Sequence, residues 1–339
     1  MKKKWTVYTG TFADCFYTMQ FDNNLLEISE LKSVFNPADK SAFFAVSENG
    51  RRMYVANEFR EGKGGVAVFD VSDKENPIFL NEQSSGGQGP AHISLTNLYG
   101  KDYLLGSGYF DGDITIYPID QQGMILPLSE RICLQKGSNA HAIMSIPESN
   151  YILVTNTGHG EVYTYKLLPD GKLEHQHTFK ENGFDAPRHM IFSDDGCYVY
   201  ILTEKTNTLD VFEIDRETGK LCHLQQTSTL PDDFQEKSEA SAIHMSPDKK
   251  YIYCSNRGHD SIVVYYVRKD HLVDKIGYVE EGIAWPREFA IDPEGKSMIV
   301  GNQLEKSLSI YRMNEKNGMP EYTGNKIKLE EGPICFAFL

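Results

Sequence analysis

Two features are missing from this 339-residue sequence, namely long apolar runs and closely spaced cysteines. No apolar run reaches the length of about 18 residues that a membrane-spanning helix requires. The six cysteines are scattered without a C-x-x-C pair, which favours reduced thiols over a disulfide framework or a zinc site. The basic start Met1–Lys4 is followed by Trp5–Gly10, which is not the continuous apolar core of a signal peptide. These absences predict a cytoplasmic protein that does not associate with membranes.

Positive charge is also scarce, because 34 Lys and Arg residues are set against 48 Asp and Glu residues, for a formal net charge of −14. Nucleic acids and anionic membranes bind proteins through basic surfaces, so we expect neither as a partner. The overall charge leaves room for a local basic pocket. Aromatic residues are abundant instead, with 19 Tyr and 18 Phe, as expected where rings pack between β-sheets.

Several catalytic motifs are absent from the sequence. It contains no G-x-S-x-G nucleophile elbow, no P-loop and no H-E-x-x-H zinc motif. The glycine-rich segment Gly86–Pro90 leads into a predicted strand rather than a helix, which argues for a tight turn and against a dinucleotide loop. We therefore predict neither a metal nor a cofactor.

One pattern recurs along the chain, in which short β runs alternate with polar turns that carry Asp, Asn or Gly. An aromatic residue marks the end of the third run in each repeat, at Phe21, Phe69, Tyr117, Tyr165, Phe212, Tyr265 and Tyr311. The spacings are 48, 48, 48, 47, 53 and 46 residues, and the segment Asp232–Lys237 accounts for the longest one. This period is typical of four-stranded propeller blades, and the 3.6-residue periodicity of helical repeats is absent. The sequence therefore predicts an all-β fold, a seven-bladed β-propeller with four-stranded blades.

The two ends of the chain are predicted to complete one blade together. The last β run, Pro333–Phe338, has no second or third run after it, whereas Thr6–Phe21 supplies a second and a third run without a first. Pairing the N- and C-terminal strands closes the ring and covers strand edges that would otherwise be exposed. We therefore predict one domain that spans residues 1–339. The repeat gives no indication of the oligomeric state.

The first strand of a blade lines the channel and the second returns beside it, so the start of the first lies near the end of the second. Four predicted hairpins span 16 positions each, for example from Arg188 to Glu204. The first-strand starts contribute to one mouth of the channel His92, His141, Arg188, His189, Arg287 and Glu288. The second-strand ends contribute Asn57, Glu58, Asn156, Glu204, Asn256, Arg257, Asn302 and Gln303. Three arginines and three histidines at one mouth predict a cationic pocket for a small anion, with Asn and Gln as hydroxyl partners.

Each of these residues also has a purely structural interpretation. The histidines could be hydrogen-bonded residues at strand starts, Arg188 could pair with Glu204 to tie two strands, and Arg257 could stack between blades. The functional interpretation is favoured because all of them gather at one end of the channel in a chain whose net charge is −14.

The predicted pocket suits acid–base chemistry on an anionic ester. His141 or Glu204 could activate water while Arg188 steadies the oxyanion that forms at an attacked carbonyl, and the identity of the base stays open among these two and a further histidine, His189. Arg257 and Arg287 could hold a distal phosphate or carboxylate bidentately. Hydrolysis of a sugar lactone fits, because such lactones open unaided and need only modest acceleration. The residues predicted to bind substrate are His92, His189, Arg287, Asn256, Asn302 and Gln303.

Several segments resemble a known family, namely Gly86–His92, Pro187–Phe192, Ile243–Asp248, Ser255–Ser261 and Trp285–Arg287. Through them the whole chain resembles the lactonase family of seven-bladed propellers, which includes bacterial 6-phosphogluconolactonases and fungal carboxymuconate cycloisomerases. The family uses a His, an Arg, a Glu and a second Arg for catalysis. The resemblance implies that the corresponding catalytic residues here are His141, Arg188, Glu204 and Arg257.

The resemblance also implies a substrate, 6-phosphogluconolactone, which would be hydrolysed to 6-phosphogluconate in the pentose phosphate pathway. Two alternatives stay open. The chain could be a carboxymuconate-type cycloisomerase or a lactonase for another organic anion. It could also be a non-catalytic propeller that binds peptides or proteins across its faces, although the repeats lack the Gly-His and Trp-Asp marks of that class.

Overall fold

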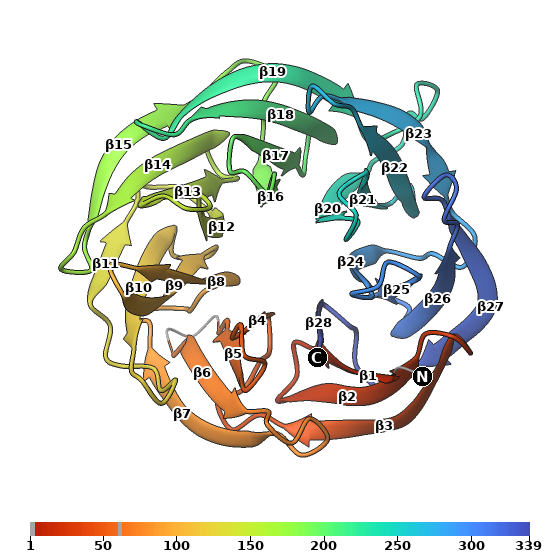
Figure 1. The fold of residues 1–339 in the computed structure, drawn as a ribbon, viewed down its shortest axis with the longest axis horizontal. Coiled ribbons are helices and arrows are strands. Elements are labelled where there is room, and N and C mark those ends of the chain that lie inside the picture. The colour runs from red at the N-terminus through yellow and green to blue at the C-terminus, as the bar shows by residue number, and fades with distance from the viewer. Residues whose placement is uncertain (1–3, 60–62) are drawn as a thin grey trace.

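The computed structural model describes residues 4–59 and 63–339, and within them it contains 28 strands and no helix. The strands form seven four-stranded sheets that surround a central channel as blades (Figure 1). The predicted seven-bladed propeller is therefore confirmed. Six residues of the predicted domain, 1–3 and 60–62, lie outside the described residues. No described segment forms a helix that could cross a membrane.

The strands occupy four positions in blades 1 to 7, from the channel outward. The innermost strands are, in blade order, β4 (Phe43–Val46), β8 (His92–Leu98), β12 (Ala140–Ser145), β16 (Pro187–Phe192), β20 (Glu239–Met245), β24 (Pro286–Ile291) and β28 (Cys335–Phe338). The second strands are β5 (Arg52–Asn57), β9 (Lys101–Gly108), β13 (Tyr151–Asn156), β17 (Tyr198–Thr203), β21 (Tyr251–Arg257), β25 (Ser297–Asn302) and β1 (Lys4–Gly10). The third strands are β6 (Gly65–Asp70), β10 (Asp113–Ile119), β14 (Glu161–Leu167), β18 (Thr208–Asp215), β22 (Ser261–Val267), β26 (Ser307–Met313) and β2 (Cys15–Asp22). The outer strands are β7 (Ile78–Ser84), β11 (Glu130–Cys133), β15 (Leu173–Phe179), β19 (Lys220–Ser228), β23 (Val273–Val279), β27 (Pro320–Lys328) and β3 (Glu27–Phe35).

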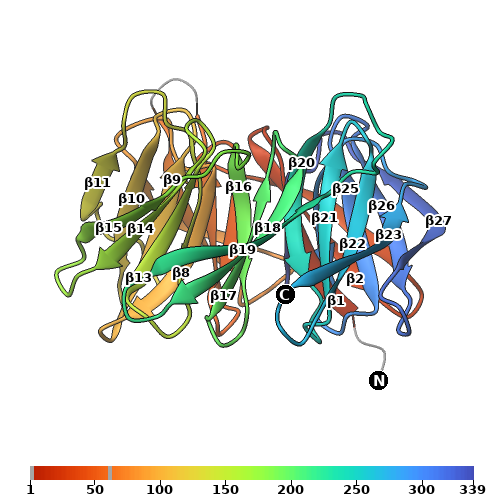
Figure 2. The same cartoon turned by 90° about the horizontal axis from the view of Figure 1, so that it is seen from above.

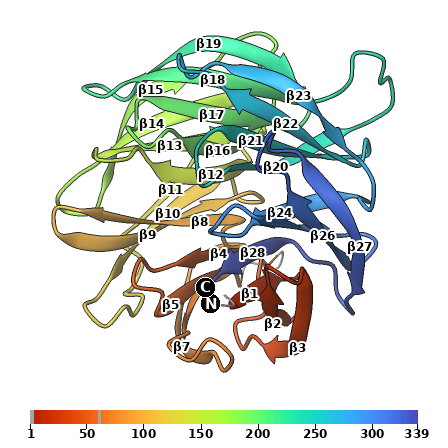
Figure 3. The ribbon, with the colours of Figure 1, turned by 45° about the vertical axis from the view of Figure 1, so that its right-hand side comes forward.

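Blade 7 joins the two ends of the chain, as predicted. Its sheet has the order β28–β1–β2–β3, and β28 pairs antiparallel with β1 from Cys335, opposite Gly10, to Phe338. Two backbone hydrogen bonds extend this pairing, from Thr6 to Leu339 at 3.1 Å and from Leu339 back to Thr6 at 2.8 Å. The N- and C-terminal ends of the described chain accordingly lie close together (Figure 3). The ring is closed by hydrogen bonds within this sheet.

The aromatic residues of the repeat all lie on the third strands and are buried where one blade packs against the next. Three of them also use their hydroxyl groups. Tyr117 donates to the carbonyl of Ser84 at 3.4 Å, Tyr265 to that of Ser228 at 2.8 Å, and Tyr311 to that of Glu281 at 2.7 Å. Burial of one large side chain stabilises the fold by about 1.5–3 kcal/mol. The blades stand side by side with their connecting loops on two opposite faces (Figure 2). The repeat spacing therefore reports contacts between neighbouring blades.

Candidate active site

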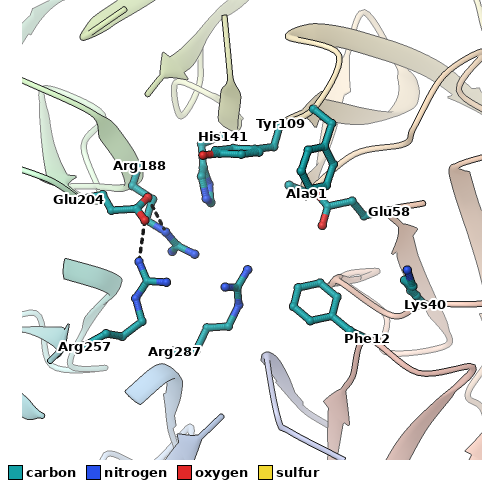
Figure 4. Close-up of a pocket in the computed structure, with 11 residues that line it drawn as sticks. Phe12, Lys40, Glu58, Ala91, Tyr109, His141, Arg188, Glu204, Arg257 and Arg287 are labelled. Carbon is teal, nitrogen blue, oxygen red and sulfur yellow. Dashed lines mark hydrogen bonds and ion pairs between the residues drawn. The ribbon is translucent and has the colours of Figure 1, made fainter. Parts of the chain in front are cut away.

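A cavity of about 480 Å³ opens at the mouth of the channel where the innermost strands begin (Figure 4). Every blade contributes to its wall, and the lining residues are Phe12, Lys40, Glu58, Ala91, Tyr109, Phe110, His141, Arg188, Glu204, Arg257 and Arg287. Four of these side chains are cations and two are carboxylates. The volume lies in the range of small-molecule sites, about 300–1,000 Å³. A small anion is therefore the ligand that this wall favours.

Three of the side chains that line the cavity enter it where innermost strands are bulged. In four consecutive blades, 3 to 6, the pairing of the first two strands shifts register between Ala140 and Ala142, Pro187 and Met190, Ala240 and Ile243, and Pro286 and Glu288. The innermost strands of blades 1, 2 and 7 pair without such a shift. A bulge leaves a residue unpaired and re-aims its side chain. His141, Arg188 and Arg287 occupy these positions in blades 3, 4 and 6, and all three line the cavity.

Two of the bulges follow a residue with left-handed backbone. Ala186 and Trp285 have φ values of 56° and 51°, and each precedes a Pro-Arg pair. Such a conformation costs about 1–3 kcal/mol outside glycine and is concentrated at functional sites. The second strands hold it in place, because the amide of Glu204 donates to the carbonyl of Ala186 at 2.8 Å and that of Gln303 to Trp285 at 3.2 Å. The fold thus maintains strained backbone directly before two cavity arginines.

Glu204 links two of the arginines. Arg257 Nη2 donates to Glu204 Oε1 at 2.7 Å, and Arg188 Nε lies 3.5 Å from Glu204 Oε2 (Figure 4). Burial alone would raise the pKa of Glu204, but the positive charges of Arg188 and Arg257 outweigh it and lower that pKa below its ordinary value. Glu204 is therefore ionised at neutral pH, and its carboxylate holds two guanidinium groups in place.

Arg287 differs from the other two arginines in its partners. Within the part of the chain that the structure describes, no ion pair joins its guanidinium to a carboxylate, and its Cζ lies 5.1 Å from the centre of the Phe12 ring. Burial and repulsion from Arg257 lower its pKa below the ordinary arginine value, although it remains a cation at neutral pH. A buried guanidinium that forms no ion pair with a carboxylate is stabilised more by binding an anionic ligand than one that is already paired.

His141 is buried, and its ring points into the cavity (Figure 4). Its Nδ1 is buried without a hydrogen-bond partner within residues 4–59 and 63–339. Burial, followed by the charges of Arg188 and Arg287, lowers the pKa of His141 well below its ordinary value of 6.5. The imidazole is therefore neutral at neutral pH and carries a lone pair that can accept a proton.

His92 and His189 pack behind His141 and do not line the cavity. The ring centre of His189 lies 5.0 Å from that of His141 and 5.7 Å from that of His92. Burial and the charge of Arg188 lower the pKa of His92 to about 3 and that of His189 well below its ordinary value. These rings are neutral, and their position indicates that they support His141 and Arg188 from behind.

The three amides predicted to bind hydroxyl groups, Asn256, Asn302 and Gln303, are not among the lining residues. Asn256 is buried in its own blade, where its Nδ2 donates to the carbonyl of Thr229 at 2.8 Å, and Asn302 makes similar internal bonds in blade 6. Successive side chains of a strand point to opposite faces. The Arg257 side chain therefore points into the cavity, whereas the Asn256 side chain points into the interior of its blade. We assign the two asparagines a structural role.

Among the other residues predicted at the mouth, some line the cavity and some do not. Glu58 lines the cavity, whereas Glu288 pairs with His244, with 2.7 Å between Glu288 Oε1 and His244 Nε2. Asn57 and Asn156 are buried without lining it. Among the described residues no three His, Cys, Asp or Glu side chains cluster closely enough to hold a metal ion.

Five lining residues were not predicted from the sequence: Phe12, Lys40, Ala91, Tyr109 and Phe110. A signal was present for three of them. Tyr109 directly follows β9, as Glu204 directly follows β17, and Phe12 and Phe110 are the second residues after β1 and β9. Aligning the ends of all seven second strands, aromatic residues included, would have found them.

Comparison with known proteins places these residues in a family context. The family described as "Lactonase, 7-bladed beta-propeller" matches residues 6–338. This chain belongs to that lactonase family. The 6-phosphogluconolactonase of Bacillus subtilis is 29% identical, with 99% of each chain covered. A 6-phosphogluconolactonase of Formosa agariphila is 28% identical over 91% of this chain and 90% of its own.

Solved structures agree with this membership of the lactonase family. A candidate 6-phosphogluconolactonase from Bacteroides fragilis superposes with a TM-score of 0.86 at 26% identity, covering 99% of this chain and 98% of that one. The periplasmic gluconolactonase of Pseudomonas aeruginosa has a TM-score of 0.90 at 22% identity, with 99% of both chains covered. The second comparison shows a shared fold.

Three histidines that the fold keeps neutral make the stability of this lactonase-family protein depend on pH. His92, His141 and His189 have pKa values lowered by folding, whereas unfolded histidine titrates near pH 6.5. The unfolded chain therefore binds more protons below that pH, so stability is complete above it and is lost as the pH falls. We expect the free energy of unfolding, measured with urea, to be lower at about pH 5.5 than at about pH 7.5, and the lowered pKa of His92 alone accounts for about 1.4 kcal/mol of that difference.

A variant separates this effect from general acid sensitivity. His92→Asn removes one of the three groups and should reduce the difference in unfolding free energy between the two pH values by about 1.4 kcal/mol, whatever its effect on absolute stability. Equal unfolding free energies at the two pH values would show that the three rings are not held neutral by the fold.

Proposed function

We propose that this protein hydrolyses a sugar lactone, with 6-phosphogluconolactone as its substrate and 6-phosphogluconate as its product. The observation that carries the proposal is one cavity in which a neutral histidine faces three arginines and an ionised glutamate. Membership of the lactonase family supports hydrolysis of a cyclic ester. The curated relatives named 6-phosphogluconolactonase support the phosphorylated sugar.

The chemistry assigns a separate task to each group. His141 accepts a proton from water as the water oxygen attacks the lactone carbonyl. The carbonyl oxygen becomes an oxyanion, which the Arg188 guanidinium stabilises. The ring C–O bond then breaks, the proton returns from His141 to the leaving ring oxygen, and the product is a hydroxy acid. Glu204 keeps Arg188 oriented through their ion pair, and Arg257 holds Glu204 from the other side.

A low pKa makes His141 a weak base, which is acceptable for this reaction. Lactones of this type open unaided, so a modest lowering of the barrier, about 1.4 kcal/mol for each tenfold in rate, is useful. The same low pKa keeps the imidazole unprotonated among three arginines. Glu204 is the less suitable base, because two guanidinium groups occupy its oxygens.

The test is a coupled assay that follows 6-phosphogluconate release from freshly prepared 6-phosphogluconolactone. The purified protein should accelerate release well above the spontaneous rate. Parallel reactions with gluconolactone and with a carboxymuconate distinguish the alternatives, namely a lactonase for another anion and a cycloisomerase. Absence of acceleration with all three would contradict an enzymatic role and favour a non-catalytic propeller.

Arg287 provides the prediction on substrate choice. Because its guanidinium has no carboxylate partner among the described residues, we propose that it binds the phosphate of the substrate. A charge-assisted hydrogen bond contributes about 1.5–3 kcal/mol, so Arg287→Met should raise KM for the phosphorylated lactone about 10–100-fold. KM for the unphosphorylated lactone should change by less than about twofold.

The matched control is Arg268→Met, which removes an exposed arginine of an outer loop in blade 5 and should leave both KM values unchanged. An equal rise of KM for both lactones in Arg287→Met would remove this residue from phosphate recognition.

A further inference from the structure

A buried hydroxyl connects the bulge that carries His141 to the bulge that carries Arg188. Thr155 lies on β13 opposite Ala142, and its Oγ1 accepts a hydrogen bond from the Ala142 amide at 2.9 Å. The same hydroxyl donates to the carbonyl of Arg188, in the next blade, at 2.7 Å. Thr155 is fully buried and does not line the cavity. One side chain thus fixes the backbone on both sides of a blade boundary.

A second hydroxyl continues the connection to Arg287. Arg188 Nη1 donates to the carbonyl of Ser241, which lies in the bulge of blade 5. The hydroxyl of Ser241 donates to the carbonyl of Arg287, in blade 6, at 2.7 Å. Ser241 is also fully buried and outside the cavity wall. A series of hydrogen bonds therefore links four blades, from Ala142, which is next to His141, through Arg188 to Arg287.

We propose that Thr155 and Ser241 are positioning residues, which set the spacing of the base, the oxyanion partner and the anion-binding arginine. This proposal rests on the proposed function for its kinetic consequences. A bulge interrupts the regular hydrogen bonds between neighbouring strands that fix an ordinary strand. The backbone of the four bulges therefore needs other interactions to hold it in place. The two hydroxyls supply it, and each joins one site residue to the next.

The two positions should affect different kinetic constants. Thr155→Val removes the hydroxyl with little change in volume and loosens His141 and Arg188, so kcat should fall about tenfold while KM changes less than about twofold. Thr155→Ser restores the hydroxyl and should restore kcat. Ser241→Ala releases the backbone of Arg287, so KM for the phosphorylated lactone should rise about tenfold with a smaller change in kcat.

Ser94→Ala is the matched control. Ser94 lies on the innermost strand β8, and its hydroxyl donates at 2.7 Å to the carbonyl of Ile143 in the next blade, which is the same type of bond away from the cavity. This variant should lose a similar amount of stability but leave kcat and KM unchanged. Equal kinetics in Thr155→Val and Ser94→Ala, or failure of Thr155→Ser to restore kcat, would overturn the proposal.

Hydrogen exchange followed by mass spectrometry tests the connection without any substrate. Thr155→Val should increase amide exchange in its own blade, over residues 140–145, and across the boundary, over residues 187–192. An increase confined to residues 140–145 would contradict the connection. If the wild-type protein hydrolyses no lactone, the proposed function is wrong, and the exchange result alone decides whether Thr155 joins the two bulges.

Discussion

A chain that ends at Gly332 is expected to be largely unfolded at 25 °C. The deletion removes β28, and with it the buried side chains of Ile334, Cys335 and Leu339. Burial of Ile334 and Leu339 alone is worth about 3–6 kcal/mol, and the hydrogen bonds to β1 are lost as well. The net stability of a folded domain is only about 5–15 kcal/mol. The stabilisation lost in the deletion is therefore comparable with the whole net stability of the domain.

The deletion also changes the ring itself. It exposes the edge of β1, a buried strand whose amides and carbonyls then have no partner and can pair with another chain. We expect aggregation in size-exclusion chromatography and loss of the cooperative transition in circular dichroism. A synthetic peptide of residues 333–339 should restore part of the folded signal. A truncated chain that melts within about 5 °C of the intact protein would show that blade 7 is stable with three strands.

The fold could be predicted because every blade places a large aromatic residue at the same position, where it packs against the neighbouring blade. Residues such as Phe69 and Tyr311 must fill the space between neighbouring blades, so their spacing records the blade period directly. The closure of the ring followed from counting, since one first strand was left over at Phe338 and one was missing before Thr6. Each inference depended on local patterning repeated seven times.

The site was harder to predict, because register at the start of the innermost strands is not encoded locally. A regular hairpin would place Arg188 and His189 on opposite faces, but the bulge in blade 4 sets both against a single residue of β17. Contacts across blades accompany this shift, among them the hydrogen bond from the Thr155 hydroxyl to the carbonyl of Arg188. Spacing alone placed His141 at the mouth where the cavity lies, but it could not show that Arg257 lines the cavity and the adjacent Asn256 does not.

Arg188→Met is expected to lower kcat for lactone hydrolysis about 10³-fold, with KM changed less than about tenfold. Arg188 is buried, faces the cavity, and is held by Glu204 and the Ser241 carbonyl. A preorganised donor to an oxyanion is worth about 10²–10³ in kcat, and Arg188 also helps to keep the imidazole of His141 neutral. Arg188→Lys should recover little, because an ammonium group cannot make the same set of planar contacts.

The pH profile of Arg188→Met distinguishes loss of the oxyanion partner from general damage to the site. Burial and the charge of Arg188 lower the pKa of His141, and among the charges that lower the pKa of Glu204, Arg188 is the largest contributor. In the proposed mechanism both groups act in their deprotonated forms, so removing Arg188 should raise both pKa values and move the acid limb of kcat/KM to higher pH. Free guanidinium added to Arg188→Met should restore part of kcat and return that limb toward its original position. A variant with kcat within about tenfold of wild type and an unchanged acid limb would place the oxyanion at another group, and Arg287, the cation without a carboxylate partner among the described residues, would then be the candidate.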